Sequence, residues 1–376
     1  MKSFNHLMEI ALSDEVIMKS FHKVALKRKK HKRCRKYLID AEATIKDIPN
    51  WIENYENDKH TPKIINDGIK QKKRKIIVPT FKELVVQHCV VNALMPMFMQ
   101  GMYEHTYASI PNRGSHKAKR YIEKWIRNDK KNCKYVLKMD IRHFFDSIPH
   151  DILKDMLTES IHDKAMLDLL CKIIDVTDVG LPLGFYTSQW LSNWYLKGLD
   201  HYIKENLNAK HYVRYMDDMV IFGSNKKELH RIRVEVQKYL EDNLGLELKD
   251  NWQVYRFIYK SKGKEKGRDL DFMGFRFRRG YTLIRKSIML KMIRKARRIG
   301  NKDRPTIYDI RQMLAYKGWL KATDTYRLYN KYIQPYVSFK KMSKTLSNVD
   351  KNKSLILWKG VLFYDAYLQP CTRLAS

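Results

Sequence analysis

The stretch His211-Tyr-Val-Arg-Tyr-Met-Asp-Asp-Met-Val-Ile-Phe-Gly223 decides the fold of this chain. Two runs rich in β-branched and aromatic residues flank an acidic pair, which predicts a β-hairpin. Asp217 and Asp218 would then lie at or beside its turn. An isolated Asp-Asp pair is more often simply a good turn former, because its carboxylates bond to the nearby backbone. The pair alone therefore does not establish a functional site.

A third carboxylate has the same kind of support. Asp140 ends the strand-like run Lys134-Tyr-Val-Leu-Lys-Met-Asp140. Phosphoryl transfer with two metal ions needs carboxylates that converge from rigid elements and hold the cations about 3.5–4 Å apart. One strand end and one hairpin turn can supply them. Asp140, Asp217 and Asp218 are therefore the candidate catalytic and metal-binding residues.

The chain carries a large positive charge. Its 376 residues include 74 Lys and Arg against 41 Asp and Glu, a formal net charge of +33. Such a surplus predicts a polyanionic partner. The 23 Tyr, 14 Phe and 7 Trp favour nucleic acid over a membrane, because bases stack on aromatic rings. No dominant basic amphipathic helix with a lipid-facing stripe supports the membrane alternative.

Several other classes of protein are disfavoured. The five cysteines are scattered, odd in number and without a CxxC pair, which argues against a disulfide framework and a zinc ribbon. The thirteen histidines show no HExxH spacing. No apolar run approaches the length of a membrane span, and no signal peptide opens the chain. A reducing cytosol is the expected compartment.

The first half of the chain alternates basic and apolar segments. Residues 1–60 look helical, and their cationic run over 27–36 is either a solvated face or a helix that grips phosphates. Residues 68–79 lead from basic residues into an apolar strand. This pattern places Lys73 and Arg74 on a hairpin, where they would suit a triphosphate or simply face solvent. Residues 81–102 read as a buried helix.

Later blocks are turn-rich or basic. In the loop over 107–118, Gly114 and Ser115 offer an anion site at a helix N-terminus, although a plain N-cap explains Ser115 equally well. A bent segment over 180–189 enters a helix. Residues 244–249 and 271–277 alternate as strands, and from 283 onward the chain is helical and basic, which suits contact with a duplex backbone.

In this order the blocks resemble those of a reverse transcriptase, over roughly residues 60–280. The resemblance implies an α+β, right-hand polymerase fold with fingers, a palm made of an antiparallel sheet with helices, and a helical thumb. It divides the chain into a basic helical N-terminal region (1–60), fingers (61–139), a palm with the catalytic carboxylates (140–280) and a basic helical thumb (281–376).

The resemblance also implies a role for each matching residue. Asp140 and Asp217 would ligate two Mg²⁺ ions, for which Mn²⁺ can substitute, with the Ile141 backbone carbonyl as a further ligand and Asp218 as a weaker acid. Phe145 would be the steric gate against a 2′-OH. The nucleotide-binding set would be Lys73, Arg74, Phe145, Leu183, Gly184 and Gln189. The template- and primer-binding set would be Arg113, Gly114, Ser115, His116, Tyr215, Met216, Lys249, Met273 and Gly274.

One block departs from the general pattern. Most reverse transcriptases carry QGxxxSP where this chain reads Leu183-Gly-Phe-Tyr-Thr-Ser-Gln189. This form resembles the enzymes of diversity-generating retroelements, which copy a template RNA into cDNA that is mutated at adenines (mutagenic retrohoming). The resemblance implies dNTPs, template RNA and a cDNA/RNA duplex as partners, with a small basic oligomeric accessory protein and no membrane. It also implies a bacterial or phage-encoded, cytoplasmic protein.

Two alternatives remain open at this point. A retron, phage-defence or intron-like reverse transcriptase could share the altered block by chance. A non-catalytic RNA-binding scaffold could keep a polymerase fold. The intact carboxylates argue against the scaffold, because their mutual repulsion is costly without metal.

Overall fold

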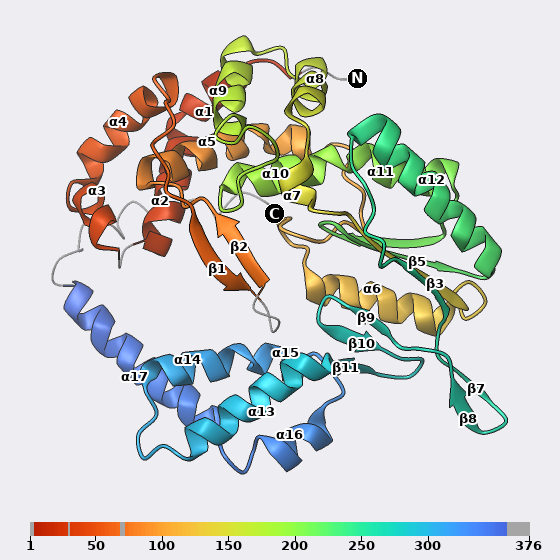
Figure 1. The fold of residues 1–376 in the computed structure, drawn as a ribbon. Coiled ribbons are helices and arrows are strands. Elements are labelled where there is room, and N and C mark those ends of the chain that lie inside the picture. Colours follow the sequence, from red (N-terminus) through yellow and green to blue (C-terminus); the bar gives the residue numbers. More distant parts are fainter. Residues whose placement is uncertain (1–3, 29–30, 68–71, 359–376) are drawn as a thin grey trace, which may run out of the picture. The chain divides into compact units, whose positions relative to one another are not determined.

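The computed structural model describes residues 4–28, 31–67 and 72–358 (Figure 1). The chain forms two compact units, one within residues 1–268 and one within 269–376. Each unit has its own core and is described by itself. Among the described residues, no helix combines the length and the apolar character that crossing a membrane would require.

The first unit begins with helices, as the sequence predicts. They are α1 (Leu7–Leu12), α2 (Asp14–Arg28), the 3₁₀ turn η1 (Lys32–Cys34), α3 (Arg35–Ile39) and α4 (Ala41–Glu53). Helices α1, α2 and α4 pack around α5 (Phe81–Met99), which lies in the core. A capping box fixes the start of α5: Thr80 Oγ1 accepts from the Glu83 backbone N–H, and the Glu83 carboxylate accepts from the Thr80 N–H.

A hairpin of β1 (Lys63–Asp67) and β2 (Lys72–Ile76) precedes α5. The strands pair antiparallel, with Ile65 opposite Arg74. The predicted hairpin is therefore present, as a two-stranded sheet of its own. The side chains of Lys73 and Arg74 are exposed.

The central sheet has four antiparallel strands in the order β4-β5-β3-β6. They are β3 (Tyr135–Asp140), β4 (His211–Tyr215), β5 (Asp218–Gly223) and β6 (Gln253–Arg256). Residues 219–222 of β5 are all buried, so both faces of this strand are covered. Helix α12 (Lys226–Leu244) packs on β3 and β5, and α6 (Ser115–Asn128) contacts β4 (Figure 1).

Shorter elements complete the first unit. The remaining helices are α7 (Phe144–Ser147), α8 (His150–Ser160), α9 (Lys164–Ile174), α10 (Tyr186–Tyr195), α11 (Lys197–His201) and the π-helical turn η2 (Tyr202–Asn206). A second hairpin is formed by β7 (Tyr259–Ser261) and β8 (Lys264–Lys266).

The strand predicted over 244–249 is wrong. Helix α12 continues to Leu244, and Gly245 caps it with a left-handed φ of 58°. Beyond the cap, only Leu248 forms an isolated bridge, opposite Ile141. The alternating leucines still predict burial correctly, since Leu246 and Leu248 are buried.

The second unit combines a small sheet with helices. Its strands are β9 (Leu270–Phe272), β10 (Phe275–Phe277) and β11 (Thr282–Ile284), in the order β11-β10-β9. Its helices are α13 (Lys286–Gly300), α14 (Ile307–Ala315), α15 (Lys317–Lys321), α16 (Tyr326–Tyr332) and α17 (Phe339–Trp358). The helical region predicted from 283 therefore begins at Lys286, after the last strand.

The single strand predicted over 271–277 is instead a hairpin. Met273 and Gly274 have φ angles of 51° and 85°, so both residues of the two-residue turn lie at positive φ, as in a type I′ turn. A Cβ at Gly274 would lie 2.6 Å from Cη2 of Trp319. Glycine is thus required both by the turn and by the indole packed against it.

Candidate active site

The three predicted carboxylates lie together at one end of the central sheet. Asp140 is the last residue of β3 and Asp218 the first of β5, and the two are paired across the strands. Asp217 occupies the turn between β4 and β5, and its carbonyl accepts from the Ile141 N–H at 3.4 Å. A strand end and a hairpin turn therefore converge as the sequence indicates.

The electrostatics of Asp217 reflect this convergence. Burial raises the pKa of Asp217 to about 6, and the nearby charges of Asp140 and Asp218 contribute in the same direction. The positive charge of Lys249 opposes them. Carboxylates held this close repel one another, so a cation between them would stabilise the charged site.

Two lysines supply positive charge beside these carboxylates. Lys249 Nζ donates to Asp140 Oδ1, and the Lys249 backbone N–H donates to the Asp140 carbonyl at 2.8 Å. Lys138 Nζ lies 3.8 Å from Asp218 Oδ1. In the described ranges, no three His, Cys, Asp or Glu side chains are arranged to hold a metal ion. The donor set is nevertheless all oxygen, the type that Mg²⁺ prefers, so the chemistry of these residues fits that ion.

The turn that presents Asp217 is conformationally strained. Met216 has a φ of 58°, an uncommon value for a residue other than glycine. Its carbonyl accepts from Arg214 Nη1 at 3.1 Å, and Ser192 Oγ donates to its sulfur at 3.4 Å. Surrounding side chains therefore hold the turn in this conformation, as is typical of strain kept at a functional site.

Behind the turn lies a buried polar network that the sequence analysis missed. The Arg214 guanidinium is fully buried and donates to both carboxylate oxygens of Asp200, at 2.8 and 2.6 Å. It also donates to Asn193 Oδ1 at 3.2 Å, and Tyr212 donates to Asp200 at 2.7 Å. The one available signal was a charged Arg214 within an otherwise apolar and aromatic strand.

The segment after Gly180 docks against α7. The Leu181 N–H donates to the Phe145 carbonyl at 2.6 Å. Gly180 has a φ of 77°, and a Cβ there would lie 2.5 Å from the same carbonyl oxygen. Phe145 itself is half-buried. The close backbone approach explains why a glycine precedes the block.

The same segment docks against the end of β2. The Ile77 N–H donates to the Leu183 carbonyl at 2.8 Å. Gly184 has a φ of 118°, and a Cβ there would lie 2.1 Å from the Ile77 carbonyl oxygen. Leu183 is half-buried and Gln189 is exposed on α10. Three predicted nucleotide-binding segments, namely β2, α7 and the Leu183 block, are thus linked by backbone contacts.

The predicted template block has a structural role of its own. Arg113 Nη1 donates to the carbonyls of Tyr103 and Thr106, at 2.5 and 3.0 Å, which fixes the preceding loop. Gly114, with a φ of 126°, is the N-cap of α6 and provides no side-chain cap. The N-cap reading of Ser115 is therefore wrong, because Ser115 is the first helical residue. His116 is exposed beside it.

The other predicted template and primer residues fall in different places. Tyr215 pairs with Asp218 across the β4-β5 turn, and Lys249 binds Asp140. Met273 and Gly274 form the β9-β10 turn, which belongs to the second unit.

Comparison with known proteins identifies one family and several relatives. The sequence model of the family described as "Reverse transcriptase (RNA-dependent DNA polymerase)" matches residues 58–277, more than half of the chain. The Retron Ec73 reverse transcriptase of Escherichia coli is 27% identical over 203 residues, covering 50% of this chain and 61% of that protein. Protein YkfC of Escherichia coli K12 is 26% identical over 220 residues, covering 47% and 58%.

Among solved structures, telomerase from Candida tropicalis in complex with a TWJ fragment of telomeric RNA is similar with a TM-score of 0.47 and 12% identity. That match covers 82% of this chain and 57% of the telomerase chain. The chain spans about three fifths of the length of the two curated Escherichia coli relatives. The matched residues 58–277 contain the converging carboxylates and the blocks docked beside them, and the chain belongs to the reverse transcriptase family.

Proposed function

We propose that this protein is an RNA-directed DNA polymerase that uses two-metal phosphoryl transfer. The observation that carries the proposal is the convergence of Asp140, Asp217 and Asp218 at one end of β3 and β5, with the pKa of Asp217 raised to about 6. Such a site is stabilised by divalent cations, and Mg²⁺ is the expected ion, with Mn²⁺ as a substitute.

Each residue of the site has a role in this proposal. Asp140, Asp217 and the Ile141 carbonyl would hold the ions, with Asp218 as the outer acid. When bound, the ions would polarise the phosphoryl oxygens and activate the attacking hydroxyl. Lys249 donates to the Asp140 carboxylate. Lys249 must release this carboxylate before Asp140 can ligate an ion.

The docked segments would form the nucleotide site. Lys73 and Arg74 are exposed cations on β2 and would bind the triphosphate of the incoming dNTP. Phe145 would lie under the sugar, with Leu183, Gly184 and Gln189 beside the base. The template and primer strands would meet Arg113 to His116, Tyr215, Met216, Lys249, Met273 and Gly274.

The proposal includes a division of the chain. Residues 1–60 would be a basic N-terminal region, 61–139 the fingers, 140–280 the palm and 281–376 the thumb. The strands β9 to β11 (270–284) share a compact unit with the helices after them, so the palm boundary at 280 cuts a structural unit. The partners would be a template RNA and the cDNA/RNA duplex.

Primer extension tests the activity. A DNA primer annealed to a defined RNA should be extended with dNTPs and Mg²⁺, and chelation of the metal should stop the reaction. A protein that binds the primer-template tightly but never extends it, with either Mg²⁺ or Mn²⁺, would be the non-catalytic scaffold instead.

Phe145→Ala is expected to admit ribonucleotides. The ring would exclude a 2′-OH by volume, and apolar contacts of this kind typically discriminate by about 1–3 kcal/mol, or 10–200-fold. The ratio of kcat/KM for dNTP over rNTP measures the effect. Phe145→Tyr keeps the ring and should keep the ratio. An unchanged ratio in an active alanine variant would make Phe145 a packing residue only.

We further propose that the enzyme belongs to a diversity-generating retroelement and misincorporates opposite template adenines. Leu183 supports this, because it stands where the general family has a polar Gln and offers the incoming nucleotide only apolar contact. Such contact discriminates weakly. A small basic oligomeric accessory protein would join the complex with the template RNA, in the cytoplasm of a bacterium.

Leu183→Gln is expected to lower the error rate. Sequencing cDNA copied from one defined RNA measures errors at each template base, and Leu183→Met is the control because it conserves volume and apolar character. Errors in the wild type should concentrate at adenines. An even spread over the four bases would contradict the retroelement assignment, and an unaltered error rate in the Gln variant would exclude Leu183 as the cause.

A retron-type enzyme is the second candidate, favoured by the 27% identity to the retron reverse transcriptase of Escherichia coli. The DNA sequence on either side of the gene distinguishes the retroelement from the retron. A retroelement should have two neighbouring near-repeats that differ chiefly at adenines of one copy. A retron should lack such a pair.

A further inference from the structure

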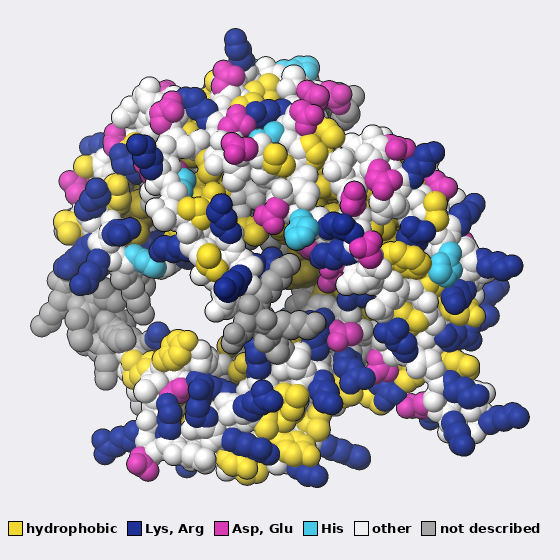
Figure 2. All heavy atoms as spheres, in the orientation of Figure 1, with side chains coloured by type: hydrophobic (Ala, Val, Ile, Leu, Met, Phe, Trp, Pro, Cys, Tyr) yellow, Lys and Arg dark blue, Asp and Glu magenta, His cyan; other side chains and the backbone are white. Residues whose placement is uncertain are grey.

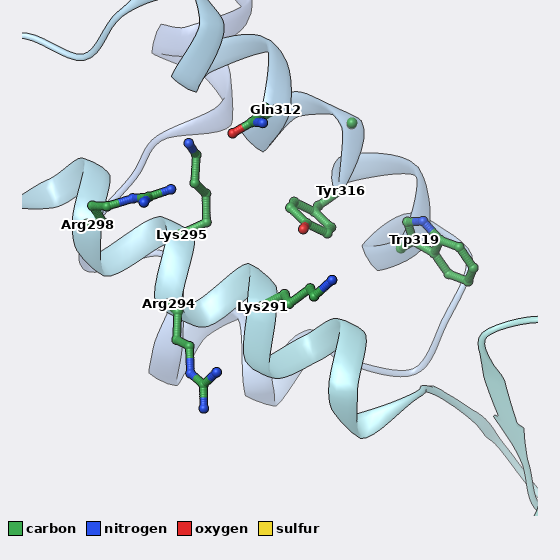
Figure 3. Close-up of a pocket in the computed structure, with 8 residues that line it drawn as sticks. Lys291, Arg294, Lys295, Arg298, Gln312, Tyr316 and Trp319 are labelled. Carbon is green, nitrogen blue, oxygen red and sulfur yellow. The ribbon is translucent and has the colours of Figure 1, made fainter. Parts of the chain in front are cut away.

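A basic and aromatic pocket lies within the second unit, between α13 and the pair α14 and α15 (Figure 3). It has a volume of about 620 Å³. Its walls are formed by Lys291, Arg294, Lys295, Arg298, Gln312, Ala315, Tyr316 and Trp319. In Figure 2, Lys and Arg side chains mingle with hydrophobic ones over this helical region.

One wall of the pocket is cationic. Lys291, Arg294, Lys295 and Arg298 follow the i, i+3, i+4, i+7 spacing of one helix face. Lys295 is buried and donates to Asp309 at 2.7 Å, so its charge is balanced beneath the wall. The remaining three side chains are exposed. Among the residues that the structure describes, no carboxylate lines the cavity, and its positive lining favours an anion.

The opposite wall is aromatic. Tyr316 and Trp319 are three residues apart, and both rings are half-buried. Trp319 is held against Phe275, with ring centroids 4.9 Å apart, and against Gly274. Figure 3 shows Lys291 extending toward Tyr316 and Trp319. Aromatic rings beside exposed cations are a suitable arrangement for a flat, negatively charged ligand.

The shape of the site favours an unpaired nucleotide over a duplex. A duplex hides its bases and needs only a row of cations along a surface, whereas a cavity of about 620 Å³ has room for a single base. Exposed bases of a single strand stack on aromatic side chains. A duplex backbone would contact the cations of the pocket but would make no use of its aromatic wall.

We propose that this pocket binds an unpaired nucleotide of a single-stranded nucleic acid. The base stacks on Tyr316 beside Trp319, and the flanking phosphates bind Lys291 and Arg298. The pocket residues all belong to the second unit and include none of the predicted carboxylates, and ligand binding there requires no polymerisation.

The test is equilibrium binding of two labelled ten-nucleotide strands to the full chain in EDTA. One strand carries bases and the other is abasic, with the same phosphate charge. The wild type should bind the base-bearing strand roughly 5–150-fold more tightly, which is what stacking of one base is typically worth. Tyr316→Leu should remove most of this preference, and Tyr316→Phe should keep it.

A charge-matched pair of variants tests the phosphate wall. Lys291→Gln with Arg298→Gln should weaken both strands, and by more than Arg327→Gln with Lys340→Gln, which removes two exposed cations of α16 and α17 outside the pocket. Equal losses from the two pairs, or a Tyr316→Leu variant that keeps the wild-type preference for bases, would overturn the proposal. If Lys291→Gln with Arg298→Gln weakened the binding of a blunt duplex as strongly as that of the single strand, the pocket would be part of a duplex-binding face instead.

Because the measurement is made without divalent metal, its outcome does not depend on the proposed enzyme activity. A protein inactive in primer extension could still show the preference for bases, and an active polymerase could lack it.

Discussion

Asp217→Asn is expected to abolish polymerisation while making the metal-free protein more stable. Loss of one ligand carboxylate removes several kcal/mol of transition-state stabilisation, so primer extension should fall by at least about 10²–10³-fold. The gain in stability follows from the environment of the carboxyl group. Burial and the charge of Asp140 raise its pKa to about 6, so the folded protein prefers the protonated form.

The pH dependence has a definite sign. An Asp carboxyl in an unfolded chain has a pKa of about 3.9. The stability contributed by the protonated form is complete below about pH 4 and is lost as the pH rises through about 6. At pH 8 the charged group therefore destabilises the fold, by about 3 kcal/mol. The Asn variant should melt higher than the wild type at pH 8 in EDTA, and equally at pH 4.

Thermal melts at both pH values, with primer extension on the same samples, give the measurement. Asp242→Asn removes an exposed carboxylate of α12 and should change neither activity nor melting temperature. An Asp217→Asn protein that retains near-normal activity would contradict the metal-ligand assignment. A variant that melts lower at pH 8 would contradict the electrostatic account.

Arg214→Met is expected to cause the largest loss of stability among the substitutions considered. It would leave the fully buried Asp200 carboxylate without its cation, and breaking a buried pair in this way typically costs about 3–5 kcal/mol. The support for the Met216 carbonyl would be lost as well. Denaturant unfolding should show the change, and primer extension should fall because the turn carrying Asp217 relaxes.

Two further variants separate the charge effect from general disruption. Arg142→Met breaks an ion pair with Asp250, whose side chain is 92% exposed, and should cost less than about 1 kcal/mol. Adding Asp200→Asn to Arg214→Met removes the stranded charge and should recover part of the stability. A double variant as unstable as the single one would show that packing, not charge, dominates at Arg214.

The placement of the three candidate carboxylates could be predicted from sequence, because each lies at the end of a short contiguous run. Apolar and aromatic runs around Asp217 and before Asp140 indicate two strands, and their ends carry the acids. The supporting network could not be predicted in this way. Asp200 and Asn193 lie on the helices α11 and α10, 14 and 21 residues before Arg214, and no contiguous sequence pattern pairs them with β4.

The errors in secondary structure have physical causes. Residues 244–249 alternate between buried and less buried positions, whereas in 271–277 the alternation breaks at Gly274 and Phe275, which are both buried. A period of two therefore does not specify strand pairing over a whole run. A left-handed Gly245 ends a helix in the first, and a tight turn at Met273 and Gly274 folds the second back on itself. In both cases a glycine inside the alternating run was the local signal that the chain changes direction.

The contact between Ile77 and the Leu183 block constrains how the β1-β2 hairpin can move. Gly184 places its backbone so close to the Ile77 carbonyl that no side chain fits between them, and a hydrogen bond closes the contact. The base of the hairpin is therefore pinned, whereas Lys73 and Arg74 lie further along the strand. We expect that a movement of the hairpin about Ile77 would carry Lys73 and Arg74 with it and would leave the Leu183 block in place.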